Sequence, residues 1–234
     1  MKKKMFMLLF VICLVIGLTA CDKKNNDGVK FKEDYESMNG EVNANGMEHR
    51  SVSIPSDNPM KEVSASDIVS MIENKETFYV YFGSKLCPWC RSVIETAIKT
   101  ANDDAVKTIY YVDIWDDEGN EILRDKYGLT DEGKVEAISE GTKEYKKLLK
   151  YFDELLEEYN LTNDNGDKIP VNEKRIYAPN FVYIENGKAV KLVEGTSSKQ
   201  KDSREELTKE ILEDEEEIFD SFFSLGNSCK SDKC

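Results

Sequence analysis

The chain has 234 residues, of which 33% are charged and 40% hydrophobic, and its formal net charge is −14. Binding of nucleic-acid phosphates requires basic patches, so this acidic balance argues against nucleic acid as a partner. An acidic surface is also repelled by anionic lipid headgroups, so any membrane attachment has to come from a lipid anchor rather than from the protein surface.

The first twenty residues have the pattern of an export signal. Lys2–Lys4 form a positively charged start, and the apolar run 5–18, of roughly 14 residues, is short for a membrane-spanning helix and typical of a signal-peptide core. The run ends in Leu18-Thr19-Ala20-Cys21, which resembles the bacterial lipobox. This resemblance implies a lipoprotein whose Cys21 is acylated, becomes the first mature residue and anchors the chain to the extracytoplasmic face of the cell membrane. The alternative is an ordinary signal peptide with an incidental cysteine.

Residues 22–60 are polar and rich in Asn, Lys, Asp, Glu, Ser and Gly, without sustained periodicity. This composition predicts a disordered tether behind the lipidated Cys21, which would hold the folded domain on the order of 35 Å from the membrane. The only histidine, His49, falls in this segment without neighbouring ligand residues. We expect it to be solvated and to have no role.

The folded domain is predicted to span residues 61–225. Helix caps at 64–67 precede a short segment with helical apolar spacing, which predicts a first helix. The aromatic and β-branched run 78–82 predicts a buried strand, residues 92–101 a helix, and 108–114 a second strand. The order β, α, β implies a parallel pair of strands joined by a right-handed crossover.

Two cysteines, Cys87 and Cys90, stand between the first predicted strand and the following helix, in the motif Cys-Pro-Trp-Cys. At a helix N-terminus, unpaired backbone N–H groups and the helix dipole favour negative charge, so the first cysteine can ionise near neutral pH. Its thiolate can attack a disulfide and then be released by the second thiol. The motif therefore predicts thiol–disulfide exchange.

The remaining cysteines also have to be assigned, because disulfides can persist outside the cytosol. Cys13 lies in the segment predicted to be removed. Cys229 and Cys234 lie in a tail, residues 226–234, beyond the last predicted helix. This second pair could close a small disulfide loop, act as a redox relay for the first pair, bind metal, or be disordered.

Residues 116–176 are predicted to form a mainly helical insertion. Apolar spacing predicts a helix at 120–127 and a clearer one at 143–159, capped by Thr142, with a stripe that faces the core. The segment 163–167, Asn-Asp-Asn-Gly-Asp, does not fit a calcium-binding loop, because Leu and Asn stand where the first and last carboxylates belong. Its Asn-Gly pair predicts a hairpin turn instead.

The end of the domain is predicted to be a hairpin and a helix. Strands at 181–184 and 189–193 flank an Asn186-Gly187 pair, which is a strong signal for a tight hairpin turn. A capping box that opens at Ser203 predicts the start of the final helix. Its acidic run 213–217 is expected to be solvated.

Taken in order, these elements resemble the thioredoxin fold. The strand that leads into Cys-Pro-Trp-Cys, Pro179 directly before a strand, and the Asn-Gly-Lys turn 186–188 carry the resemblance. It implies an α/β domain with a central mixed sheet flanked by helices and a cis-proline hairpin, to which this chain adds the predicted helical insertion. It also implies the site: the nucleophile Cys87, the resolving Cys90, and the supporting residues Lys85, Pro88, Trp89 and a cis Pro179.

Two positions depart from the thioredoxin pattern. That family carries a buried Asp in the strand six residues before the first cysteine, and here the position holds Tyr81. Help with proton transfer would have to come from water or from a carboxylate such as Asp113. The residues between the cysteines are Pro-Trp rather than Gly-Pro, and because this pair tunes the reduction potential, the direction of electron flow is not determined by the motif.

The predicted function is that of an extracytoplasmic, lipid-anchored thiol–disulfide oxidoreductase that acts on protein or peptide cysteines, depends on a redox partner and needs no cofactor. The lipobox, tether and strand sequence together are also similar to thioredoxin-like accessory proteins of Gram-positive bacteria, including those linked to bacteriocin export. One alternative is a non-catalytic binding module for export or assembly. Another is a structural zinc site, with ligands from both pairs, Cys87, Cys90, Cys229 and Cys234.

Overall fold

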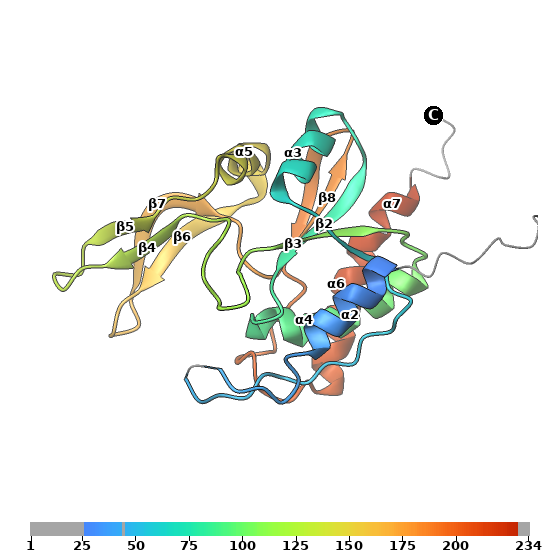
Figure 1. Cartoon of the computed structure of the whole chain (residues 1–234), viewed down its shortest axis with the longest axis horizontal. Helices are drawn as coiled ribbons and strands as arrows, with labels where there is room; N and C mark the ends of the chain where they lie inside the picture. Colours follow the sequence, from blue (N-terminus) through green and yellow to red (C-terminus); the bar gives the residue numbers. More distant parts are fainter. Residues whose placement is uncertain (1–25, 44, 229–234) are drawn as a thin grey trace, which may run out of the picture.

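The computed structural model describes residues 26–43 and 45–228. This part of the chain is an α/β protein with a five-stranded mixed sheet flanked by helices, from which two further β-hairpins extend to one side (Figure 1). Its elements in chain order are α2 (Asn26–Glu36), β1 (Met60–Glu62), α3 (Ala65–Glu73), β2 (Phe78–Gly83), α4 (Pro88–Asp103), β3 (Ile109–Asp113), β4 (Lys126–Leu129), β5 (Val135–Ser139), α5 (Lys143–Tyr151), the 3-10 helix η1 (Asp153–Leu155), β6 (Glu157–Thr162), β7 (Lys168–Arg175), β8 (Asn180–Glu185), β9 (Lys188–Val193), α6 (Lys209–Phe223) and α7 (Leu225–Ser228).

The strand order in the main sheet is β1-β3-β2-β8-β9. Strands β2 and β3 run parallel, with Tyr79 opposite Ile109 and Gly83 opposite Asp113. This confirms the predicted parallel pair and its connection through a helix. Strand β1 also runs parallel to β3, whereas β8 is antiparallel to β2 and β9 to β8. The sequence did not predict β1, because three residues are too few to show a strand pattern.

Strand β2 lies at the centre of the sheet, and all six of its residues are buried. Its side chains alternate between two cores. Tyr79 and Tyr81 pack on the face covered by α2, α4 and α6, whereas Val80 and Phe82 pack on the face covered by α3 and α5. This is the period of two expected for a strand with both faces buried. The two cysteines thus follow a strand that is held from both sides.

The prediction of a disordered tether over residues 22–60 is wrong for the part that the structure describes. Helix α2 packs on the sheet through Phe31 and Tyr35, which are 4% and 0% exposed, and the segment after it buries Val52 and Ile54. These apolar side chains are too few and too widely spaced to form a sustained helical pattern. They are ordered because the tyrosine-lined face of the sheet receives them, with Phe31 edge-on to Tyr111.

The insertion at 116–176 contains four strands and only one short α-helix with a 3-10 turn, so the prediction of a helical insertion is also wrong. Strand β4 occupies part of the predicted helix 120–127, and α5 ends at Tyr151, well before the predicted end at Tyr159. The cap at Thr142 is confirmed. Pairing of β4 with β5 and of β6 with β7 overrides the local helical spacing, because strand pairing depends on partners that a single segment does not contain.

Both predicted Asn-Gly turns are confirmed. Gly166 has a φ of 84° between β6 and β7, and Asn186 and Gly187 have φ values of 51° and 75° between β8 and β9. Positive φ at two successive positions, as at Asn186 and Gly187, is what a two-residue hairpin turn requires, and Asn and Gly are the residues that adopt it most readily.

The final helix begins later than predicted. Helix α6 starts at Lys209, and the hydroxyl of Thr208 accepts a hydrogen bond from the Ile211 amide, whereas Ser203 lies in the preceding loop. The true cap is the residue directly before the apolar stripe that packs on the sheet. Among the described residues, no helix is both long and apolar enough to cross a membrane.

Two ionisable side chains predicted to be solvated are buried. His49 is 7% exposed, and Glu215, from the acidic run on α6, is 0% exposed. The hydroxyl of Thr96 on α4 donates to the Glu215 Oε2 atom at 3.0 Å. Burial raises the pKa of Glu215 to about 7, although Thr96 and the charge of Arg50 act in the opposite direction.

This raised pKa makes the stability of the protein depend on pH. Between about pH 4.5 and 7, the folded protein binds a proton that the unfolded chain has lost, so the free energy of unfolding should fall as the pH rises through this window. We expect this decrease in the free energy of unfolding to be on the order of 1–2 kcal/mol, after allowance for solvent screening, and to be absent in Glu215→Gln. Urea denaturation at a series of pH values measures it. Glu217→Gln, at an exposed neighbour, is the control and should retain the fall.

Candidate active site

The dithiol lies at the start of α4, directly beyond the end of β2. Cys87 is the N-cap residue of the helix, and its Sγ atom accepts a hydrogen bond from the Cys90 amide at 3.4 Å. Pro88 occupies the first helical turn, where its missing N–H costs nothing. Both thiols are free, with Cys87 4% and Cys90 0% exposed. The helix therefore directs its N-terminal amide groups at the first sulfur.

The Cys87 thiol faces the start of β8, from which it is separated by 91 residues in the sequence. Its Sγ–H donates to the Ala178 carbonyl oxygen at 3.5 Å. The peptide bond between Ala178 and Pro179 is cis, as the resemblance to thioredoxin implied. Asn180 holds this turn, because its side chain accepts from the Tyr177 amide at 2.8 Å and donates to the Pro179 carbonyl at 2.9 Å.

The two thiols differ in acidity. Hydrogen bonding with the Cys90 thiol lowers the pKa of Cys87, and two backbone N–H groups at the helix start act in the same direction, although burial opposes them. Burial raises the pKa of Cys90, and the proximity of Cys87 raises it further. The pair therefore favours a thiolate on Cys87 and a protonated thiol on Cys90, which are the states that a nucleophile and a resolving cysteine need.

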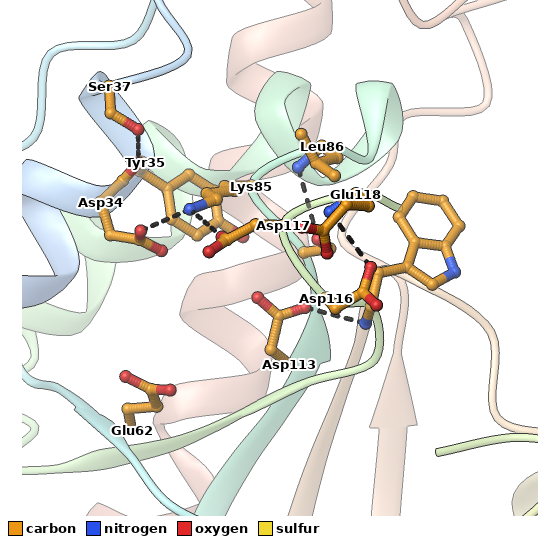
Figure 2. A network of polar contacts seen from close by, with 12 residues as sticks. Asp34, Tyr35, Ser37, Glu62, Lys85, Leu86, Asp113, Asp116, Asp117 and Glu118 are labelled. Atoms are coloured by element: carbon orange, nitrogen blue, oxygen red, sulfur yellow. Dashed lines mark hydrogen bonds and ion pairs between the residues drawn. The ribbon is translucent and has the colours of Figure 1, made fainter. Parts of the chain in front are cut away.

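Lys85, predicted to support the nucleophile with its positive charge, is engaged elsewhere. Its Nζ atom lies between two carboxylates, at 2.6 Å from Asp34 Oδ1 on α2 and 2.7 Å from Asp117 Oδ1 in the loop after β3 (Figure 2). Burial alone would lower the pKa of Lys85, but these hydrogen bonds raise it above its ordinary value. Lys85 therefore links the segment between β2 and α4, which contains it, to helix α2 and to the loop after β3.

A cation that sequence reasoning did not predict comes from the insertion. The positive charge of Arg124 contributes to the lowered pKa of Cys87. Arg124 is buried and forms a bidentate ion pair with Glu121. It also donates to the Ile176 carbonyl at 3.1 Å, just before the cis-proline turn. The sequence carried no signal for it, because its position depends on how the insertion folds back onto the sheet.

Apolar side chains surround the dithiol. Trp89, Trp115 and Ala178 are half-buried and pack against the core cluster that contains Cys87 and Cys90. Pro179 is buried. This arrangement leaves the first turn of α4 and the cis-proline turn as neighbouring parts of one apolar surface.

Three tyrosine hydroxyls and one carboxylate lie beneath the dithiol. The hydroxyls of Tyr35 and Tyr81 are 2.8 Å apart, and the Tyr111 hydroxyl donates to Asp113 Oδ2 at 2.8 Å. The second oxygen of Asp113 accepts from the Trp115 amide at 3.0 Å (Figure 2). Burial raises the pKa of Asp113. The position that holds an acid in thioredoxins thus holds Tyr81, with Asp113 nearby on the adjacent strand.

The difference in acidity between the thiols can be measured. We expect iodoacetamide to alkylate Cys87 with a midpoint pH below that of an ordinary thiol, about 8.5, because the helix amides and Cys90 stabilise the thiolate. Cys90→Ala should raise the midpoint, since it removes the largest stabilising contact. Ser92→Ala, which removes a hydroxyl group in the first turns of α4, should leave the midpoint pH unchanged. Mass spectrometry of labelled peptides gives the rates.

Three predicted residues, Cys21, Cys229 and Cys234, lie outside the described residues. Within residues 26–43 and 45–228, no group of three or more His, Cys, Asp or Glu side chains is arranged to hold a metal ion. Comparison with known proteins finds no protein-family profile that matches the chain and no curated protein that is significantly similar to it.

Proposed function

We propose that the chain is a thioredoxin-like thiol–disulfide oxidoreductase, anchored through a lipid on Cys21 to the extracytoplasmic face of a bacterial membrane. The observation that carries this proposal is the geometry of the dithiol. Cys87 caps α4, its Sγ atom is 3.4 Å from the Cys90 amide, and it faces the carbonyl before cis Pro179 at 3.5 Å. The substrates are cysteines of proteins or peptides.

The reaction in the reducing direction has two steps. The Cys87 thiolate attacks one sulfur of a substrate disulfide, so that a mixed disulfide forms and the other substrate sulfur leaves as a thiolate. Cys90 then loses its proton and attacks the Cys87 sulfur, which forms the Cys87–Cys90 disulfide and releases the second substrate sulfur. The dithiol has lost two electrons and the substrate has gained them, while the two released thiolates take up protons. The reverse steps oxidise a substrate dithiol.

The surroundings of Cys87 support binding of an extended substrate. The Ala178 carbonyl of the cis-proline turn lies 3.5 Å from the Cys87 sulfur, and we expect an extended peptide to pair with backbone at this turn as a further strand does. Trp89 and its neighbours provide apolar contact next to it. A redox partner has to restore the dithiol or the disulfide after each turnover.

The sheet supports the thioredoxin-like part of the proposal. A parallel pair β2/β3 beside an antiparallel pair β8/β9, with helices on both faces, is compatible with that fold. The inserted hairpins β4-β5 and β6-β7 lie between β3 and the cis-proline turn. The membrane attachment is supported by the lipobox-like residues 18–21.

Redox titration and two activity assays test the proposal. The reduced chain should reduce insulin, or the oxidised chain should reactivate a scrambled disulfide protein, and Cys87→Ala should abolish either activity. Unchanged activity of Cys87→Ala would overturn the proposal. A Cys87→Ser/Cys90→Ser chain that still restores the function of a deletion strain would instead favour a non-catalytic binding module.

A further inference from the structure

The Tyr81 hydroxyl links Cys90 to helix α2. Tyr81 lies in the same buried core cluster as Cys90, and hydrogen bonding with its hydroxyl acts to lower the pKa of the Cys90 thiol against the larger effect of burial. The Tyr35 hydroxyl lies 2.8 Å from the Tyr81 hydroxyl. Tyr35 and Tyr81 are both 0% exposed. The Tyr81 ring stacks between Phe181 and Tyr111, with centroid distances of 4.4 and 5.4 Å. The hydroxyl is therefore held in one position by packing on both ring faces.

Gly83 makes room for this hydroxyl. It lies two residues after Tyr81, on the same face of β2, and an added Cβ atom there would lie 2.1 Å from the Tyr81 Oη atom. Real Cβ atoms do not approach other atoms so closely, so a larger residue would displace the hydroxyl. The Tyr81 side chain thus runs along the strand toward the dithiol.

The chemistry of the resolving step requires a donor at this place. Burial raises the pKa of Cys90, so its thiolate has to be stabilised by a nearby hydrogen-bond donor when it attacks. Hydrogen bonding to the Tyr81 hydroxyl acts in that direction, and so does hydrogen bonding to the Ser84 backbone. Burial also raises the pKa of both Tyr81 and Tyr35 far above the ordinary value, so these hydroxyls keep their protons and serve as donors rather than bases.

We propose that Tyr81 is a catalytic hydrogen-bond donor to the Cys90 thiolate in the resolving step, and that Tyr35 is a positioning residue which donates to Tyr81. The inference rests on the proposed oxidoreductase function. Two hydroxyl groups in series polarise each other, so a hydrogen bond from Tyr35 to Tyr81 strengthens the hydrogen bond that Tyr81 donates to Cys90. Helix α2, outside the predicted domain, would thereby belong to the active site.

Proton and electron balance is preserved without a further reactant. The sulfur–sulfur bond between Cys87 and the substrate breaks, and the bond between Cys90 and Cys87 forms. The proton that Cys90 loses ends on the departing substrate thiolate, while Tyr81 and Tyr35 retain theirs. The other titratable or charged groups around this chain of hydroxyls are Tyr111 and Asp113 on β3, Cys87 at the start of α4, and Arg91 on α4, whose charge acts on both hydroxyls. The charge of Arg124 acts on Cys87.

The test measures the resolving step alone. In the full chain with its other cysteines replaced by serine, Cys87 is converted to a mixed disulfide with glutathione, and release of glutathione by Cys90 is followed over a range of pH. Tyr81→Phe should slow release at neutral pH by roughly tenfold to a hundredfold, the usual effect of one hydrogen bond to a charged group. It should also move the pH profile to higher pH. Tyr35→Phe should do the same to a smaller extent.

Tyr79→Phe is the matched control. Tyr79 lies on the same strand, and its buried hydroxyl donates to the Phe223 carbonyl and accepts from the Gly226 amide, both at 2.8 Å, away from the dithiol. It should lower stability but leave the release rate and its pH profile unchanged.

The outcomes separate the two proposals. A parent chain that releases no glutathione would overturn the oxidoreductase function and this inference with it. Normal release in the parent together with unchanged release in Tyr81→Phe would overturn the inference alone. If Tyr81→Phe does not fold, Tyr35→Phe decides, because it leaves the ring stack of β2 untouched, and a pH profile identical to the parent's would count against the donor chain.

Discussion

A chain carrying Arg91→Ala is expected to lose about 3–5 kcal/mol of its free energy of unfolding. Arg91 is the largest fully buried side chain of the molecule's described part. Its guanidinium donates four hydrogen bonds, to the carbonyl oxygens of Arg50 at 2.6 Å, Tyr35 at 2.8 Å and Lys85 at 3.1 Å and to Asn39 Oδ1 at 2.6 Å.

These bonds fasten the N-terminal segment to the active-site helix. Alanine would leave a cavity and three carbonyl groups without this donor, and each unpaired group that water cannot reach has its own cost. Tyr35 lies at the C-terminal end of α2. Loss of the hydrogen bond from Arg91 to its carbonyl would therefore also leave its side chain, whose hydroxyl contacts Tyr81, less firmly positioned. We therefore expect thiol–disulfide exchange to slow along with the loss of stability.

Urea denaturation of the parent and of Arg91→Ala measures the effect, with Arg204→Ala as the control at an exposed arginine. The control should remain close to the parent. Arg91→Lys should recover only part of the loss, because an ammonium group cannot reproduce the fork of the guanidinium. A loss below about 1 kcal/mol in Arg91→Ala, small against the usual cost of a cavity and of hydrogen-bond acceptors left without their donor, would show that α2 is not fastened in this way.

The second large effect is expected at Glu121, which lies between two buried arginines. Its carboxylate is 2.7 Å from Arg124 Nη2 and 3.3 Å from Arg175 Nη2, and these three side chains are 6–9% exposed. Removal of a buried counter-ion leaves the remaining charges uncompensated, so Glu121→Gln should lower the free energy of unfolding by about 3 kcal/mol or more.

The arginines also join parts of the insertion to each other. Arg124 donates to the Ile176 carbonyl, and Arg175 donates to the Asp125 carbonyl at 2.6 Å. Loss of Glu121 should therefore loosen the hairpins next to the cis-proline turn before the main sheet unfolds, which hydrogen exchange can resolve. Glu140→Gln, which breaks an exposed ion pair with Lys146 in the same insertion, is the control. A change of equal size in both variants would contradict a special role of the buried cluster.

Features defined by neighbouring residues were predicted well. The Cys-Pro-Trp-Cys motif at a helix start, both Asn-Gly turns and the Thr142 cap depend on backbone angles and on hydrogen bonds within a few residues, and the structure has them where expected. Membrane anchoring, the tail cysteines and the oxidoreductase activity stay predictions. The two largest wrong predictions, a disordered segment before residue 61 and a helical insertion, concern segments whose state depends on distant partners.

By itself, the sequence determined a buried strand that leads into a dithiol at a helix N-terminus, because strand alternation and helix capping are local properties of the chain. Only the tertiary structure decided which groups surround that dithiol. The hydroxyls of Tyr35 and Tyr81 meet although these residues are 46 positions apart in the sequence, and Arg91 donates to the Tyr35 carbonyl from 56 positions away. Such pairs carry no periodic signal, since each side chain gains its partner only after the sheet has brought the two segments together.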